Sequence, residues 1–293
     1  MNTDEFYKHL RAGGSKALLG SDKTLWVSHE RFSMLRLPAC ALNVPTDEEI
    51  RNVFRHCHAA MLSYAVMPST ARPANAALYL CTDPTYSLEK LGKHARYDVR
   101  RGLKEFHIKF LEQSEVLRLG KQAYSDTLAR TGLSVGHREP FECAFGRPRP
   151  DKYYLGALRS ERLAAFLQIL EVDDWVCIGG YSADEFLPLC PNNALVFHAV
   201  HHYLVEKKLR VIDYGLSSIQ AVSNAEGLHR FKIKMGFEAV PVRRAFVVNP
   251  VLRPFVNRVS SALVKGMLRF SPRHPVLKKA EGALRMALQG HTQ

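Results

Sequence analysis

A single stretch, residues 210–237, constrains the fold of this 293-residue chain more than any other. It begins with Arg210–Tyr214, a short run rich in apolar residues that Gly215 closes, and this predicts a buried strand. After a polar loop, apolar residues recur at i, i+3 and i+7, which is one face of a helix, at Leu228, Phe231 and Met235. Because backbone N–H groups and polar side chains converge where a strand feeds a helix, this stretch predicts a ligand site in an α/β fold.

Three polar residues of this stretch are candidates for that site. Asp213 lies at the strand end, Asn224 is placed to cap the helix, and Lys232 lies within it. The alternative is an ordinary strand–helix pair with these side chains in structural roles. For Phe231 and Phe237 the core is the favoured interpretation.

Charge and composition narrow the class of protein. The chain is 46% hydrophobic and 24% charged, which is typical of a globular protein, and its length suffices for one large or two ordinary domains. The formal net charge is +13 and the pI is about 9.6. This balance favours a polyanionic partner, namely nucleic acid, an anionic membrane surface or a phosphate-rich cofactor, without choosing among them.

The beginning of the chain and the cysteines predict a cytoplasmic protein. The first residues carry acids and no apolar core of a signal peptide, and no run of 18 apolar residues predicts a membrane-spanning helix. The six cysteines show no C-x-x-C spacing and suggest reduced thiols. His198, His201 and His202 have a spacing that could bind a metal, but no Glu or Cys nearby completes the set, so we expect no metal.

The N-terminal third predicts an α/β region. Residues 1–20 read as a loose segment, 25–37 as a strand or hairpin, and 76–81 as a strand. Residues 87–106 predict an amphipathic helix with a basic stripe, formed by Lys93, Arg96, Arg100, Arg101 and Lys104. The alternative for this stripe is a solvated charged face without a partner.

From His107 to Val248 the predicted elements follow a regular order. A strand and two helical segments precede three strands at 153–158, 163–172 and 175–181. A helix at 192–207, the strand and helix of the 210–237 stretch and a final strand at 238–248 complete the order β-α-α-β-β-β-α-β-α-β.

The 210–237 stretch resembles the last strand–helix unit of acyltransferases in the GNAT superfamily, especially the FemAB-like branch. The matching residues are Asp213-Tyr214-Gly215, Gly227-Leu228, Phe231-Lys232 and Gly236-Phe237. A basic helix such as His94–Gly102 is also similar to one in FemAB-like proteins. The resemblance implies an α/β fold with a mixed sheet over 107–250 that opens between strands 175–181 and 211–214 to admit the donor.

The resemblance also implies a division of the chain into three parts. We expect a degenerate N-terminal GNAT-like α/β lobe at 1–106, because FemAB-like enzymes are tandem GNAT domains. The GNAT-like acyltransferase domain would occupy 107–250, and a basic amphipathic helical tail 251–293.

The activity implied by the resemblance is N-acyl transfer to a substrate amine. The donor would be acyl-CoA, acyl carrier protein or aminoacyl-tRNA, with no metal. Asp213 is expected to act as the base or to orient the amine, and Tyr181 to orient the donor or a proton, although a strand tyrosine is also a common structural residue. The donor would lie near Asn192, Asn193, Ser217, Asn224 and Lys232.

One departure from the family pattern leaves a second function open. The loop 182–193, where GNAT proteins usually carry a glycine-rich pyrophosphate signature, has no glycine and two acids. Asn192 and Asn193 could still present backbone N–H groups to an anion, or could simply cap the helix. The alternative function is therefore a catalytically degenerate GNAT-like module that binds a membrane surface or polyanion through its tail.

The tail itself has the pattern of an amphipathic helix. Residues 251–270 place apolar side chains on one face and Arg or Lys off it, which is typical of a helix in an anionic membrane interface. From Pro250 onward eight Lys or Arg and one acid, Glu281, give +7 of the total +13. The alternatives are peripheral binding at the inner face of the membrane and a helix packed back on the domain.

Overall fold

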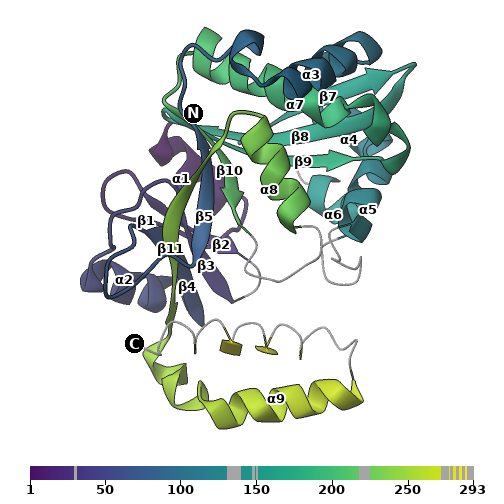
Figure 1. The fold of residues 1–293 in the computed structure, drawn as a ribbon. Helices are drawn as coiled ribbons and strands as arrows, with labels where there is room; N and C mark the ends of the chain where they lie inside the picture. Colours follow the sequence, from purple (N-terminus) through teal and green to yellow (C-terminus); the bar gives the residue numbers. More distant parts are fainter. Residues whose placement is uncertain are drawn as a thin grey trace. The chain divides into compact units, whose positions relative to one another are not determined.

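The computed structural model describes residues 1–29, 32–130, 140–146, 149, 151–217 and 225–271, together with 277, 280, 281, 284, 285 and 288. The chain forms two compact units (Figure 1). The central unit comprises Ala77–Val240 with Met1–Asn2, and the terminal unit comprises Thr3–Ala76 with Pro241–Gln293. Each unit has a hydrophobic core of its own. The division at 106 and 250 into independently folding domains stays a prediction.

The central unit contains a mixed sheet in the order β5-β10-β9-β8-β7-β6. β9 and β10 are parallel, and the other neighbours in this sheet are antiparallel. Its strands are β5 (Ala76–Cys81), β6 (His107–Leu111), β7 (Lys152–Arg159), β8 (Arg162–Val172), β9 (Trp175–Ser182) and β10 (Val211–Leu216). The predicted mixed sheet is confirmed.

Helices pack on both faces of this sheet. α3 and α7 lie together over one face, and α5 and α6 lie on the other (Figure 1). The helices are η1 (Leu88–Lys90), α3 (Lys93–Glu105), α4 (Gln113–Leu119), α5 (Lys121–Arg130), α6 (Phe141–Gly146), η3 (Asp184–Leu189), α7 (Pro191–Val200), η4 (His201–Glu206) and α8 (Ala225–Lys234). The core between sheet and helices consists of buried aliphatic and aromatic side chains, so its position follows from the apolar patterns of the sequence.

The terminal unit contains the strands β1-β2-β3-β4-β11 in that order. Its elements are α1 (Thr3–Ala12), β1 (Ala17–Leu19), β2 (Leu25–His29), β3 (Ser33–Leu37), α2 (Asp47–Cys57), β4 (Met61–Val66), β11 (Glu238–Val248), η5 (Pro250–Phe255) and α9 (Arg258–Phe270). β11 starts in the central unit and pairs antiparallel with β4 through Arg243–Val248. The terminal unit is therefore built from both ends of the chain.

Several elements differ from the sequence prediction. The expectation of a loose segment at 1–20 is wrong, because residues 3–12 form the helix α1, whose side chains Phe6 and Leu10 are buried on one face. The helix predicted at 87–106 is divided at Leu91–Gly92, and the helical segment predicted after strand 107–111 is divided into α4 and α5 at Gly120. The helix expected at 192–207 ends at Val200 as an α-helix and continues as one π-helical segment. Helix 251–270 is also divided, because Asn257 caps a new helix by accepting a hydrogen bond from the Ser260 N–H.

Candidate active site

The opening between β9 and β10 is the feature around which the candidate site is built. The two strands pair in register from Val211–Trp175 to Asp213–Cys177 and no further. β9 continues to Ser182, while β10 turns at Gly215, whose φ of 79° is a left-handed conformation suited to glycine. The pairing of β9 with β10 therefore covers only the first part of β9, and at its far end the Ser182 N–H donates to Thr127 Oγ1 at 2.8 Å. The predicted adjacency and divergence of these strands is confirmed.

Asp213 lies at the last position of β10 that pairs with β9. Its side chain is 2% exposed, and its Oδ1 accepts a hydrogen bond of 2.6 Å from the Gly215 N–H. Burial raises the pKa of this carboxyl to about 6, against the opposing effects of the Gly215 bond and of Lys232. A carboxyl with such a pKa is mostly ionised at neutral pH and can still accept a proton, as a general base must.

Lys232 of α8 supplies a positive charge that acts electrostatically on Asp213. Its Nζ donates a hydrogen bond of 2.6 Å to the Tyr214 carbonyl oxygen, and the side chain is 4% exposed. The Nζ also lies 4.2 Å from the Tyr79 ring centroid and 4.8 Å from that of Tyr214, within the range of cation–π attraction. Burial lowers the pKa of Lys232 to about 8, and the Asp213 charge opposes this shift. The site thus holds a buried acid–base pair.

A tyrosine–histidine pair borders this site and was not predicted. The Tyr79 hydroxyl lies 2.7 Å from His229 Nδ1, and their rings are 5.6 Å apart. Tyr79 is buried, which raises its pKa, whereas His229 is exposed on α8. His229 lies three residues before Lys232, so helical spacing could have suggested that it belongs to the same region. No sequence signal pointed to Tyr79, which is 150 residues away in the chain.

Ser217 and Asn224 were predicted near the donor. Ser217 lies just beyond β10, where its Oγ accepts a hydrogen bond of 2.9 Å from the Ala77 N–H and its own N–H donates to the Ala77 oxygen. Its hydroxyl thus fastens the end of β10 to β5. Asn224 lies outside the described residues. Their roles toward a donor stay predictions.

Tyr181 lies on the same face of β9 as Cys177 and Gly179, because side chains alternate along a strand. Cys177 is the partner of Asp213, so Tyr181 and Asp213 belong to one face of the sheet. The Tyr181 ring stacks on Phe166 at 4.9 Å and contacts Tyr124 at 5.4 Å. Gly179 lies between them on β9, and a Cβ added there would meet no atom within 4 Å. Within the part of the chain that the structure describes, the face between Tyr181 and Asp213 is therefore open at Gly179.

Asn192 and Asn193 lie at the start of α7, and their hydrogen bonds go to residues other than Asp213 and Lys232. Asn192 Nδ2 donates to Ser182 Oγ at 3.1 Å, and Asn193 Nδ2 lies 3.5 Å from the Met235 sulfur. Pro191 has no N–H to offer, and a Cβ on Gly102 of α3 would lie 2.5 Å from the Cys190 oxygen. The start of α7 is thus closely packed by α3, and the binding of a donor phosphate by Asn192 and Asn193 stays a prediction.

The histidines at the end of α7 contact an acid that the sequence prediction did not consider. His201 Nδ1 and His202 Nδ1 lie 3.1 Å and 2.7 Å from the two carboxylate oxygens of Glu206. Within the described part of the chain no group of three His, Cys, Asp or Glu side chains has the arrangement of a metal site.

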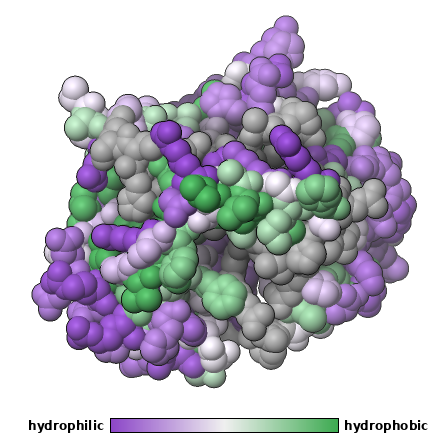
Figure 2. Space-filling model, turned by 90° about the horizontal axis from the view of Figure 1, so that it is seen from below, coloured by the Kyte–Doolittle hydropathy of each residue, from purple (hydrophilic) through white to green (hydrophobic). Residues whose placement is uncertain are grey.

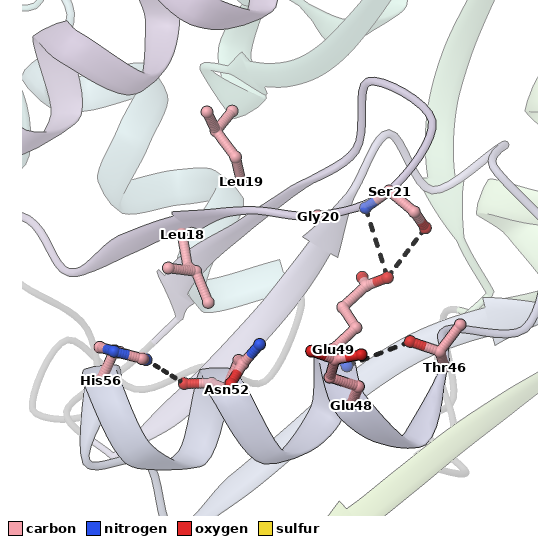
Figure 3. Close-up of a pocket in the computed structure, with 9 residues that line it drawn as sticks. All are labelled: Leu18, Leu19, Gly20, Ser21, Thr46, Glu48, Glu49, Asn52 and His56. Carbon is pink, nitrogen blue, oxygen red and sulfur yellow. Dashed lines mark hydrogen bonds between the residues drawn. The ribbon is translucent and has the colours of Figure 1, made fainter.

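A hollow in the terminal unit is lined by β1, the turn after it and α2 (Figure 3). Its polar groups are engaged with one another: Ser21 N and Oγ donate to Glu49 Oε2, and the Thr46 hydroxyl accepts from the Glu49 N–H. The other Glu49 oxygen accepts a 2.7 Å hydrogen bond from Trp26 Nε1 and lies 3.3 Å from Arg36 Nε. These contacts fasten the turn after β1 and strands β2 and β3 to α2, which is a structural role. We therefore place the candidate active site in the central unit and not in this hollow.

Comparison with known proteins identifies the fold. No family model and no curated protein matches the sequence. FemX matches with a TM-score of 0.56 and 11% identity over 85% of this chain and 92% of that one. The C-terminal domain (DUF2156) of a protein assigned as a lysylphosphatidylglycerol synthetase from Agrobacterium fabrum matches with 0.52 and 16%, over 91% of each chain. A conserved protein of unknown function from Bacteroides thetaiotaomicron gives 0.51 and 10%, over 82% and 88%.

These similarities define the class of the fold. The chain shares the fold of FemX and of the DUF2156 domain, and this is a mixed α/β fold of the kind that the GNAT resemblance predicted. Within that fold it is similar to FemX, and this agrees with the FemAB-like resemblance of the 210–237 stretch.

Proposed function

We propose that this chain is an N-acyltransferase whose reaction takes place where β9 and β10 diverge. The observation that supports this most is the buried Asp213–Lys232 pair at the last paired position of the two strands. Two structural neighbours, FemX and a domain assigned to a lysylphosphatidylglycerol synthetase, have names consistent with acyl or aminoacyl transfer.

In the proposed reaction the nitrogen of a substrate amine attacks the carbonyl carbon of the activated acyl donor. A C–N bond forms, and the bond from the acyl carbon to the sulfur or oxygen of the carrier breaks. Asp213 accepts the proton that the amine loses, and this proton, directly or by exchange with water, passes to the departing carrier, so that Asp213 is ionised again. Lys232 keeps Asp213 ionised before the attack, because its charge opposes the rise of the carboxyl pKa.

The donor proposed is acyl-CoA, acyl carrier protein or aminoacyl-tRNA, each of which is anionic. A stripe on α3 could attract any of them, because it presents exposed basic side chains at Lys93, Arg100, Arg101 and Lys104. The acids on α3 are engaged, Asp98 with Lys234 and Glu105 with Arg159.

A second candidate function is a GNAT-like module that binds a membrane or polyanion without turnover. The close packing of α3 on the start of α7 favours it, since GNAT proteins are expected to hold a donor pyrophosphate there. In either case we propose a cytoplasmic protein that associates with the inner face of the membrane. In the described residues no helix has the length and apolar character needed to cross a bilayer.

Thermal-shift titration followed by an assay of amide formation tests the proposal. Acetyl-CoA, longer acyl-CoAs and aminoacylated tRNA are the donors to compare. We expect one of them to raise the melting temperature and to be consumed with an amine, and we expect Asp213→Asn to lower turnover about 10²-fold or more.

The control variant is Asp174→Asn, which replaces an exposed carboxyl paired with Arg210 in the same unit. Unchanged turnover in Asp213→Asn would remove this residue from the mechanism, and absence of any donor effect would favour the second candidate.

A further inference from the structure

The segment formed by η5 and α9 exposes a series of large apolar side chains. Six of them are between 55% and 92% exposed, namely Val251, Phe255, Val259, Leu263, Met267 and Phe270. Single exposed apolar residues are common on proteins, whereas a contiguous group marks an interaction surface.

The apolar residues of α9 share one face of the helix. Val259, Leu263 and Met267 follow one another at intervals of four, and Phe270 falls between the first two in helical projection. The inward side is different, since Ser261 is buried and Val264 and Leu268 are half-buried. Figure 2 shows a band of hydrophobic residues across this side of the molecule with hydrophilic residues at its borders. The apolar face of α9 is therefore its outward face.

Basic residues accompany this face. Arg253, Arg258, Lys265 and Arg269 lie in η5 and α9, and no Asp or Glu occurs from Pro250 to Phe270. Two copies of this chain joined through the face would bring their positive charges together, which costs free energy. A soluble polyanion would match the charge but leave the apolar side chains in water. An anionic bilayer satisfies both, because its acyl boundary takes the apolar face and its phosphates attract the Arg and Lys side chains.

We infer that η5 and α9 form a docking surface for an anionic phospholipid bilayer, with α9 lying in the plane of the interface. The helix has 13 residues, a length of about 20 Å at 1.5 Å per residue, whereas a spanning helix needs about 20 residues. This inference narrows the second candidate function to one surface and one partner. It holds whether or not the Asp213 site turns over.

Co-sedimentation of the full-length protein with vesicles tests the inference. The vesicles are phosphatidylcholine alone and phosphatidylcholine mixed with phosphatidylglycerol, at low and high salt. We expect binding to the anionic vesicles that weakens with salt, and at least a tenfold loss in Leu263→Gln/Phe270→Gln. Ala262→Gln is the matched control, since Ala262 is an exposed α9 residue outside the apolar row and its variant should bind as the unmodified protein does. Replacing Arg258 or Lys265 by Gln should weaken binding to anionic vesicles by about fivefold each.

Failure of this inference can be told apart from failure of the acyltransferase proposal. Since the substituted side chains are largely exposed, the variants should melt at the unmodified temperature, and turnover of soluble substrates should be unchanged. Asp213→Asn should bind vesicles normally. Absence of binding to anionic vesicles at low salt would overturn the inference, as would equal losses in Ala262→Gln and the double variant. A dimer in light scattering that Leu263→Gln/Phe270→Gln converts to a monomer would also overturn it, because a second copy would then cover the face.

Discussion

The buried pair of Asp213 and Lys232 is expected to set the pH range of activity. Asp213 must be ionised to accept a proton, and its pKa of about 6 places the acid limb of the rate profile there. Lys232 opposes the rise of the Asp213 pKa while it is charged, but loss of its charge above about pH 8 leaves Asp213 ionised, so this pair sets no alkaline limb. We predict that kcat/KM rises with pH through about 6 and is level from there to about pH 8. A rate that stays constant from pH 5 to 7 would contradict the role of Asp213 as base.

The same pair makes a prediction about stability, which depends on the sign of each pKa shift. The pKa of Asp213 rises on folding, so its contribution to the free energy of unfolding is fully present below pH 3.8 and is lost as the pH rises through about 6. The pKa of Lys232 falls on folding, so its contribution is regained only as the pH rises from about 8 toward 10.5. Between about pH 6 and pH 8 both groups are charged, and the charge of each one favours the ionised form of the other.

Removing one member of the pair should therefore destabilise the fold more than removing both. Lys232→Met removes the charge that opposes the rise of the Asp213 pKa, and we expect a loss of about 1 kcal/mol at pH 7, since a pKa shift of one unit corresponds to about 1.4 kcal/mol. The loss should be smaller at pH 5, where Asp213 is largely protonated. Lys232→Met/Asp213→Asn should recover much of the stability at pH 7. Denaturant unfolding of the two single variants and the double variant measures this coupling, and additive losses would show that the two groups do not interact.

Some of these residues could be identified from the sequence and others could not. Asp213 and Lys232 lie at a strand end and on the helix that follows, so local patterns were enough to select them. The contact of Tyr79 with His229 joins β5 to α8 across 150 residues and has no local signature. Ser217 shows the same limitation, because its bonds to Ala77 could be known only from the pairing of β10 with β5.

Among the elements, β9 is the one whose surface the donor is proposed to use. Gly179 is exposed on the open face of β9 and has space for a Cβ, so a larger side chain there would occupy that face without straining the core. We predict that Gly179→Val keeps the melting temperature, weakens donor binding at least tenfold and lowers kcat/KM accordingly. Gly179→Ala should have a smaller effect. Donor titrations monitored by calorimetry check this, and unchanged affinity in Gly179→Val would exclude this face as part of the donor site.

The terminal helices show why element boundaries were harder to predict than element types. The periodicity of 251–270 predicts an amphipathic helix correctly, but Asn257 starts a new helix and leaves η5 as a separate 3₁₀ segment. In the same way Gly120 separates α4 from α5 within one continuous apolar pattern. Capping side chains and glycines act on single backbone groups, which apolar periodicity does not report.

The division of the molecule into two units depends on contacts that are distant in sequence. β11 pairs with β4 in the terminal unit, although about 180 residues separate them. The sequence predicts a boundary at 106, after α3, and this stays a prediction; Ala95 and Val99 of α3 belong to the core of the central unit. The buried clusters of the two units share no residue.

This arrangement predicts how fragments of the chain behave. Ala77–Val240 retains a whole core and should unfold cooperatively as an isolated fragment. Thr3–Ala76 lacks β11 and thereby the antiparallel partner of β4, so we expect it to stay unfolded. Asn75 N donates to the Val242 oxygen at 3.1 Å, so the two parts of the terminal unit end close together. A short Gly/Ser linker from Ala76 to Pro241 should therefore restore folding.

Near-UV circular dichroism and thermal unfolding of the three fragments decide this prediction. The linked fragment is the matched control for Thr3–Ala76, since the two differ by the linker and Pro241–Gln293. A cooperative transition in Thr3–Ala76 alone would show that β11 is dispensable for the terminal unit. An unfolded Ala77–Val240 would show that its core requires the terminal unit. If Ala77–Val240 folds and is stabilised by the same acyl donor as the whole chain, then Asp213, Lys232 and the open face of β9 are sufficient for donor binding within the central unit.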